Sequence, residues 1–229
     1  DHDNLAWKLK LVIDGKAPDA LLDTYSEERT FGADENLLNS TRSTDFITPK
    51  SKTSLTFRNA VLALARQHPF ARALVNSGRL SVPCYLTESR LNTADEDEFS
   101  GDMVPGAPMD DAPISSSCGA RWLLEALGGR FKLLYFTDDA DALDPAIVRE
   151  LAALKDGAIA LEAMLVAPKG TAPRSVVTLT DVKGLIKERY DAQPGTVYLV
   201  RPDQHVAYRA RRFDAAKVAA AVAKATCNA

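Results

Sequence analysis

The pattern of apolar and polar residues over the first part of the chain predicts three helices. The first begins in the opening stretch DHDNLAWKLKLVIDGKAP and ends at about Gly15, because its apolar residues recur at helical spacing. They fall on nearly every side, and only Lys8 and Lys10 interrupt them, so we expect this helix to be enclosed over most of its circumference. These apolar residues are Leu5, Trp7, Leu9, Leu11, Val12 and Ile13.

A second helix is predicted over residues 20–38 and a third over residues 55–67. In the second, Glu27-Glu28-Arg29 form the polar face, which we expect to be exposed to solvent. An extended segment is expected over residues 77–86. The apolar residues that define the two helices are Leu21, Leu22, Tyr25, Leu37 and Leu38 in the second and Leu55, Val61, Leu62 and Leu64 in the third.

The last 110 residues alternate between strand and helix patterns, which predicts an α/β fold. A strand, a helix and a strand imply a right-handed crossover between parallel strands, whereas the four residues 201–204 allow only an antiparallel hairpin. A βαβ unit, a crossing helix and a ββα unit follow the order of a thioredoxin-like fold. The predicted helices are 120–127, 144–154, 181–190 and 214–225, and the predicted strands are 131–136, 159–166, 176–179, 197–200 and 206–209.

The stretch between these two halves differs in composition from both. Residues 92–119 hold an acidic run at 95–98, three prolines and three consecutive serines, and no Lys or Arg occurs between Arg90 and Arg121. This composition is typical of a solvated linker. We therefore expect a helical part over 1–91, an acidic Pro/Ser-rich interdomain linker over 92–119 and a thioredoxin-like domain over 120–229.

Composition excludes several classes of function. The 229 residues are 46% apolar and 26% charged, with a net charge of −3, so there is no broad basic field for nucleic acid or an anionic membrane. No apolar run approaches the roughly 20 residues that span a bilayer, and the acidic first residues do not resemble a signal peptide. We expect a cytoplasmic protein.

The residues that carry thiol or metal chemistry are scattered. The cysteines lie outside any CxxC or zinc spacing, and the histidines have no partner at ligand spacing, so we predict reduced thiols and no metal site. The turn after strand 131–136, where a thioredoxin carries CxxC, reads TDDAD, which excludes disulfide exchange there. The residues concerned are Cys84, Cys118, Cys227, His2, His68 and His205.

Two motifs near the start resemble a known family. DHDNLAWKL resembles the D-A-x-N-L-x-W-K-L stretch of single-component FAD-dependent aromatic hydroxylases, the group of phenol and 3-(3-hydroxyphenyl)propionate hydroxylases, and LLDTYSEER resembles their LLDTYxxER. His2 and Thr30-Phe31 depart from the pattern. VPGAPMDDAPI, GARWLLEALGGRFKLLYF and PGTVYLVRPDQHVAYRARRF resemble the C-terminal thioredoxin-like domain of the larger members. The chain is thus similar to the C-terminal portion of such an enzyme.

The resemblance implies an FAD- and NAD(P)H-dependent monooxygenase that hydroxylates a phenolic substrate through a flavin C4a-hydroperoxide. The G-x-G-x-x-G turn for the FAD pyrophosphate is absent from these residues, so we expect no cofactor and no activity in this chain alone. Asp1 and Asn4 match the family motif and are expected at the edge of the flavin site. A cap or favourable charge at the helix N-terminus is the alternative for both. No catalytic residue is assigned.

The second hypothesis is a non-catalytic thioredoxin-like module for oligomerisation or protein binding. Exposed apolar positions on the first helix and the resemblance both imply association, and we expect a homodimer. Pro194, which precedes strand 197–200, is expected to follow a cis peptide bond as in thioredoxin-like folds. The aromatic substrate and the choice between NADH and NADPH are not encoded in these motifs.

Overall fold

A computed structural model describes residues 2–75, 83–170 and 175–229. The chain forms two compact units, and the division falls inside one helix. The sheet unit comprises Asp1–Glu28 together with Tyr85–Ala229, and the helical unit comprises Arg29–Cys84. These limits differ from the expected ones, because the start of the chain folds with its end.

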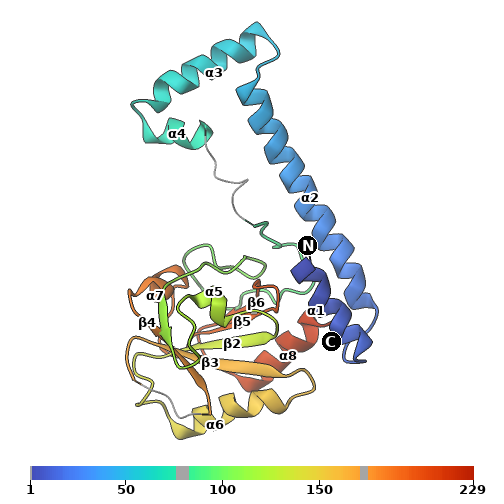
Figure 1. Ribbon diagram of the computed structural model, residues 1–229, viewed down its shortest axis with the longest axis vertical. Helices are drawn as coiled ribbons and strands as arrows, with labels where there is room; N and C mark the ends of the chain where they lie inside the picture. The colour runs from blue at the N-terminus through green and yellow to red at the C-terminus, as the bar shows by residue number, and fades with distance from the viewer. Residues whose placement is uncertain (1, 76–82, 171–174) are drawn as a thin grey trace. The chain divides into compact units, whose positions relative to one another are not determined.

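The sheet unit is built on six strands in the order β1-β4-β3-β2-β5-β6 (Figure 1). β2, β3 and β4 are parallel neighbours, whereas β5 pairs antiparallel with β2, β6 with β5, and β1 with β4. The predicted α/β fold, with its crossover and its hairpin, is confirmed. The strands are β1 (Ile114–Ser116), β2 (Phe131–Phe136), β3 (Leu161–Ala167), β4 (Val177–Asp181), β5 (Val197–Val200) and β6 (Val206–Ala210).

Helices cover both faces of this sheet. Alternate residues of β2 point to opposite faces and so into two different cores. Leu133 packs with residues of α1, α6 and α8, whereas Leu134 packs with residues of α5 and α7. Asp144 and Asp214 cap α6 and α8 by accepting backbone N–H groups of their first turns. The helices are α1 (His2–Ile13), α5 (Leu123–Ala126), α6 (Pro145–Ala153), α7 (Leu185–Arg189) and α8 (Ala215–Ala225), and a 3₁₀ turn, η2 (Leu154–Asp156), follows α6.

α1 is where predicted, but the face that it buries is not the expected one. Its buried residues are Asn4, Trp7 and Lys8, whereas Leu9 is 41% and Ile13 74% exposed. The expectation that this helix is enclosed over most of its circumference is therefore wrong. The side that faces the fold combines the apolar Trp7 with the polar Asn4 and Lys8, whose charged partners are supplied by other segments of the sheet unit, as described below.

Residues 92–119 are built into the sheet unit and are not a solvated linker. Their apolar side chains enter the core on the α5 side, and β1 extends the sheet. Asp95 accepts from Arg209 of β6 at 2.6 Å. A carboxylate of this stretch, which has no Lys or Arg of its own, is thus paired with an arginine of the sheet. Its buried residues include Met103, Ala107, Met109, Ala112 and Ile114.

The peptide bond before Pro194 is not cis, since the described residues contain no cis peptide bond. Pro194 instead occupies the second position of a tight turn in which Thr196 N donates to Gln193 O at 2.9 Å. Gly195 follows with φ +94°, the combination of a type II turn, which takes a trans proline at that position. The expectation at Pro194 is therefore wrong.

The helical unit contains the rest of α2 (Ala20–Ile47), α3 (Lys52–Ala65) and α4 (Pro69–Val75). α2 continues nine residues past its predicted end, α3 starts where Ser51 Oγ accepts from Ser54 N at 3.1 Å, and α4 was not predicted. Within the predicted apolar stripe of α3 only Val61 is buried. Residues 77–82 of the expected extended segment lie outside the described residues. Within the described ranges, no helix has the length and apolar character needed to cross a membrane.

Candidate functional site

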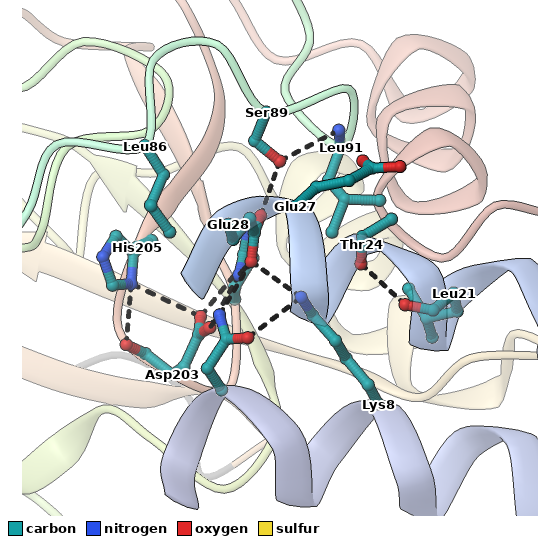
Figure 2. Close-up of polar contacts among 12 residues, drawn as sticks. Lys8, Leu21, Thr24, Glu27, Glu28, Leu86, Ser89, Leu91, Asp203 and His205 are labelled. Carbon is teal, nitrogen blue, oxygen red and sulfur yellow. Dashed lines mark hydrogen bonds and ion pairs between the residues drawn. The ribbon is translucent and has the colours of Figure 1, made fainter. Parts of the chain in front are cut away.

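The motifs that resemble the hydroxylase family meet in a buried group of charged side chains in the sheet unit. α1 and α2 contribute residues of the first two motifs, and the turn between β5 and β6 contributes residues of the last one (Figure 2). We call this group the ion cluster. Its members are Asn4, Lys8, Glu28, Arg201 and Asp203.

Glu28 is the centre of the ion cluster. Arg201 donates to both of its carboxylate oxygens, Nη1 to Oε1 at 2.6 Å and Nη2 to Oε2 at 2.9 Å. Lys8 Nζ and Asn4 Nδ2 each donate to Oε2 at 2.7 Å, and Ser89 Oγ donates to Oε1. Burial opposes ionisation of this carboxyl, but Arg201 and Lys8 outweigh it and lower the pKa of Glu28 to about 2. Glu28 is therefore ionised at neutral pH, and its predicted exposure is wrong.

Arg201 and Asp203 hold the other half of the ion cluster. The guanidinium donates to Asp203 through Nε at 3.0 Å and through Nη2 at 2.6 Å, and both side chains are almost completely buried. Burial opposes the charge on Asp203, but Arg201 and His205 lower the pKa of Asp203 far below its ordinary value. The turn is closed by Arg201 N donating to His205 O at 2.8 Å, which fixes both residues on the β5–β6 hairpin.

Lys8 and Asn4 bring α1 to this hairpin. Burial lowers the pKa of Lys8 from its ordinary value, although Glu28 offsets part of that effect. Lys8 Nζ donates to Asn4 Oδ1 at 3.0 Å, and Asn4 Nδ2 donates to Asp203 Oδ2 at 2.8 Å in addition to its bond with Glu28. Both amide hydrogens and the oxygen of Asn4 therefore have partners inside the chain.

Trp7 joins the ion cluster to the apolar core. The Arg201 guanidinium carbon lies 5.3 Å from the centre of its ring and Lys8 Nζ 5.7 Å, which is within the range of cation–π attraction. On its other side the ring meets Phe131 of β2 edge to face, with centroids 5.5 Å apart. The charges are thus covered by an aromatic side chain that belongs to the same helix as two of their partners.

The ion cluster connects α1, α2 and the β5–β6 hairpin, and it does not present a reactive group. Two cations face two anions, and each charge is hydrogen-bonded by its neighbours, as buried ionic groups require. A general acid or nucleophile needs an oxygen or nitrogen free to reach a substrate. The ion cluster therefore positions α1 and α2 against the β5–β6 hairpin.

The residues predicted for the flavin site have different outcomes. Asp1 lies outside the described residues. Asn4 is the third residue of α1, and its side chain bonds to other side chains and does not cap the helix. The motifs also contain cluster members for which polarity predicted no role, namely Glu28 in LLDTYSEER and Arg201 and Asp203 in the last motif. Lys8, one of two cations among the apolar positions of the first helix, was the available signal.

The turn after β2 contains no sulfur in the structure either. All three cysteines are free thiols and lie on other segments. Asp138 pairs with Lys187 at 3.2 Å and Asp139 with Lys169 at 3.1 Å, so these carboxylates of the turn form surface ion pairs. Among the described residues, no group of three or more His, Cys, Asp or Glu side chains could hold a metal ion.

Two protein families match the segments that meet in the ion cluster. Residues 1–40 match the FAD binding domain family, and residues 115–225 match the HcaD C-terminal domain family. The ion cluster takes Asn4, Lys8 and Glu28 from the first match and Arg201 and Asp203 from the second. The chain is thus similar to the C-terminal portion of FAD-dependent aromatic hydroxylases, and the resemblance inferred from its motifs is confirmed.

Individual relatives carry the names of such enzymes. The chain is 29% identical to 3-(3-hydroxy-phenyl)propionate/3-hydroxycinnamic acid hydroxylase of Mycobacterium sp. (strain JLS), over 90% of the chain and 37% of that protein. It is 28% identical to 6-methylpretetramide 4-monooxygenase of Streptomyces rimosus, over 93% of the chain and 37% of that protein. The chain spans little more than a third of the length of these relatives.

Solved structures show the same fold. The flavin-dependent monooxygenase PieE, in complex with FAD and substrate, matches 99% of this chain with a TM-score of 0.66 at 23% identity, over 43% of its own length. The rebeccamycin biosynthetic enzyme RebC, with reduced flavin, matches 99% of this chain with a TM-score of 0.63 at 21% identity, over 40% of its length. At these identities the likeness establishes the fold.

Proposed function

We propose that this chain forms the C-terminal part of an FAD-dependent monooxygenase that hydroxylates a phenolic or related aromatic substrate. The observation that carries the proposal is the ion cluster, in which the segment matched by the FAD binding domain is fixed to the segment matched by the HcaD C-terminal domain. An arrangement of this kind is expected if the two segments work within one enzyme. The names of the relatives supply the reaction class.

The flavin, when bound, supplies hydride transfer and oxygen activation, and we propose NAD(P)H as its reductant. The residues of this chain do not fit the cofactor by themselves. A pyrophosphate needs clustered backbone N–H groups at a glycine-rich turn before a helix, and the sequence has no G-x-G-x-x-G. The side-chain amide of Asn4 is already engaged with Lys8, Glu28 and Asp203. Asp1 and Asn4 stay predictions for the edge of the flavin site.

Flavin retention tests the proposal. The 229-residue chain is mixed with FAD, dialysed and examined for visible flavin absorption, in parallel with the protein translated from the complete reading frame. We expect the complete protein to stay yellow and to oxidise NADH or NADPH when phenols are added, and this chain to lose the flavin. A complete protein without flavin would contradict the proposed enzyme, and a yellow chain would show that its residues suffice for binding.

We also propose that the sheet unit is a thioredoxin-like scaffold without redox function. The order β3-β2-β5-β6, with β2 and β3 parallel and β5 and β6 antiparallel, supports this assignment. The turn after β2 carries carboxylates where disulfide exchange would need thiols. Incubation with insulin and dithiothreitol tests it, because a scaffold should not accelerate insulin reduction above the uncatalysed rate.

A homodimer is proposed from the exposed apolar side chains. Leu9 and Ile13 of α1 are uncovered in the sheet unit. Exposed apolar side chains favour association of one chain with another when they form a contiguous patch. Light scattering at rising protein concentration checks the proposal, and a constant monomer mass would contradict it. In the helical unit, the exposed large apolar residues are Phe31, Leu37, Leu38, Ile47, Leu55, Phe57, Leu62, Leu64, Phe70 and Leu74.

A further inference from the structure

We propose that Asp203, on the turn between β5 and β6, is a positioning residue for the first turn of α1 and, through it, for the edge of the flavin site. The inference rests on the proposed function, because α1 lies in the segment matched by the FAD binding domain. Asp203 lies in the segment matched by the HcaD C-terminal domain. The sheet unit would thus reach the flavin site without contributing a residue that touches the cofactor.

Asp203 contacts α1 on one side and its own hairpin on the other. Its Oδ2 accepts from Asn4 Nδ2 at 2.8 Å, and Asn4 is only two residues beyond the start of α1. The same carboxylate is held by two donors of Arg201, and its side chain is 2% exposed. A hydrogen bond from a neutral amide to a buried carboxylate is stronger than one between two neutral groups. The start of α1 is therefore fixed to a rigid hairpin.

Glu28 also holds the first turn of α1, but it lies on α2, whereas Asp203 lies on the hairpin itself. Glu28 lies in the same family match as Asn4 and Lys8, so its bonds to them join neighbouring parts of one segment. The bidentate bond from Arg201 seats α2, on which Glu28 lies. The bond between Asn4 and Asp203 reaches α1 itself, across 199 positions of sequence. Loss of Asp203 should therefore loosen the first turn of α1, which keeps its contacts with Glu28 and the core contact of Trp7, before it affects the central strands of the sheet unit.

The test uses the whole chain with Trp122→Phe, which leaves Trp7 as the single tryptophan reporter on α1. In this background, Asp203→Asn should raise hydrogen exchange of the α1 amides about tenfold or more, which is the effect of losing one charge-assisted hydrogen bond. The emission of Trp7 should shift to longer wavelength, and the amides of β2 and β3 should keep their protection.

The matched control is Asp95→Asn, which removes a carboxylate 2.6 Å from Arg209 on the adjacent strand without touching α1. It should leave α1 exchange unchanged. Asn4→Ala keeps every charge but removes the bonds to Asp203, Glu28 and Lys8 together, so it should raise α1 exchange at least as much as Asp203→Asn, also if the Asp203 variant does not fold. Unchanged α1 exchange in Asp203→Asn and Asn4→Ala, or a parallel rise in β2 and β3, would overturn the proposal.

The step towards the flavin is tested in the protein translated from the complete reading frame. We expect Asp203→Asn to weaken FAD binding about tenfold, the loss that corresponds to one such hydrogen bond, and Asp95→Asn to leave FAD affinity unchanged. Unaltered FAD affinity in Asp203→Asn would overturn the inference and leave the proposed enzyme intact. A complete protein that never binds FAD would contradict the proposed function, while α1 exchange would still report on the contact itself.

Discussion

Glu28 contacts four side chains at once, and both of its oxygens accept hydrogen bonds. Its charge is what allows Lys8 and Arg201 to be buried next to each other. Removal of one member of a buried, hydrogen-bonded charge group leaves its partners unpaired in a low-dielectric site. The energetic importance of Glu28 therefore comes from the cations around it.

Glu28→Gln is expected to lower the free energy of unfolding by about 3–5 kcal/mol, the range for breaking a buried ion pair. Urea unfolding followed by circular dichroism gives this value. The control is the neighbouring Glu27→Gln, because Glu27 is 54% exposed and its ion pair with Arg90, at 3.2 Å, lies at the surface. It should change stability by about 0.5 kcal/mol or less. Equal stability of the two variants would show that the ion cluster contributes nothing.

The same residue sets a pH dependence. The pKa of Glu28 falls from 4.5 in the unfolded chain to about 2 in the fold, so its ionised form contributes stability that is fully present above pH 4.5. This contribution, about 3 kcal/mol, is lost as the pH falls from 4.5 towards 2. The unfolding free energy of the native chain should drop more steeply over this interval than that of Glu28→Gln. Parallel curves would rule out the assigned shift.

The ion cluster could not be predicted from the polarity pattern of the sequence alone. A polarity pattern assigns each charge to the surface unless a partner is known, and the partner of Glu28 is Arg201, 173 positions away. Asn4 could be singled out through its motif, but the identity of its hydrogen-bond partners depends on a hairpin near the other end of the chain. The only local sign of this long-range pairing is a cation, Lys8, among apolar helix positions.

At the scale of elements, short-range signals were sufficient where a strand is buried on both faces. β2 and β5 have the predicted bounds, because apolar runs flanked by turn residues define them, with Lys132 as the one polar interruption in β2. α2 is longer than predicted because no residue after Leu38 stops a helix until Pro49. Residues 92–119 have the composition of a linker. The apolar residues between their charges nevertheless pack into the core on the α5 side.

Gly106 shows how tightly that segment is packed. It has φ +93°, and a Cβ built there would lie 2.4 Å from Leu86 O, closer than any real contact. Gly106→Ala is expected to cost about 3 kcal/mol, measured by thermal or urea unfolding, because both strain and a backbone clash must be relieved. Gly15→Ala is the control, since Gly15 has φ +65° but no atom near its Cβ position, and should cost about 1 kcal/mol. Similar losses would contradict the close approach.

At the scale of the molecule, the sheet unit is assembled from both ends of the chain, so a fragment of the expected thioredoxin-like domain is incomplete. Fragment 120–229 would lack Trp7 and Leu21 of one core and Met103 and Met109 of the other. It would also bury Arg201 without its Glu28 partner.

We expect fragment 120–229 to unfold without a cooperative transition and to bind the dye ANS, which reports exposed apolar surface. Fragment 85–229 restores the residues of 92–119 and lacks only the first 28 residues of the unit, so its intermediate stability would separate the two contributions. Cooperative unfolding of fragment 120–229 with the midpoint of the whole chain would contradict this dependence on the N-terminal segment.

The contact between Asn4 and Asp203 also sets an order of events during synthesis. A ribosome adds roughly 5–20 residues per second, so the 199 positions between the two side chains correspond to roughly 10–40 s of translation. Over that interval α1 and the start of α2 are already made, but the cationic and anionic groups of the β5–β6 turn do not yet exist. Lys8 and Glu28 can pair with each other during that time, but the ion cluster can be completed only after Arg201 and Asp203 have been synthesised.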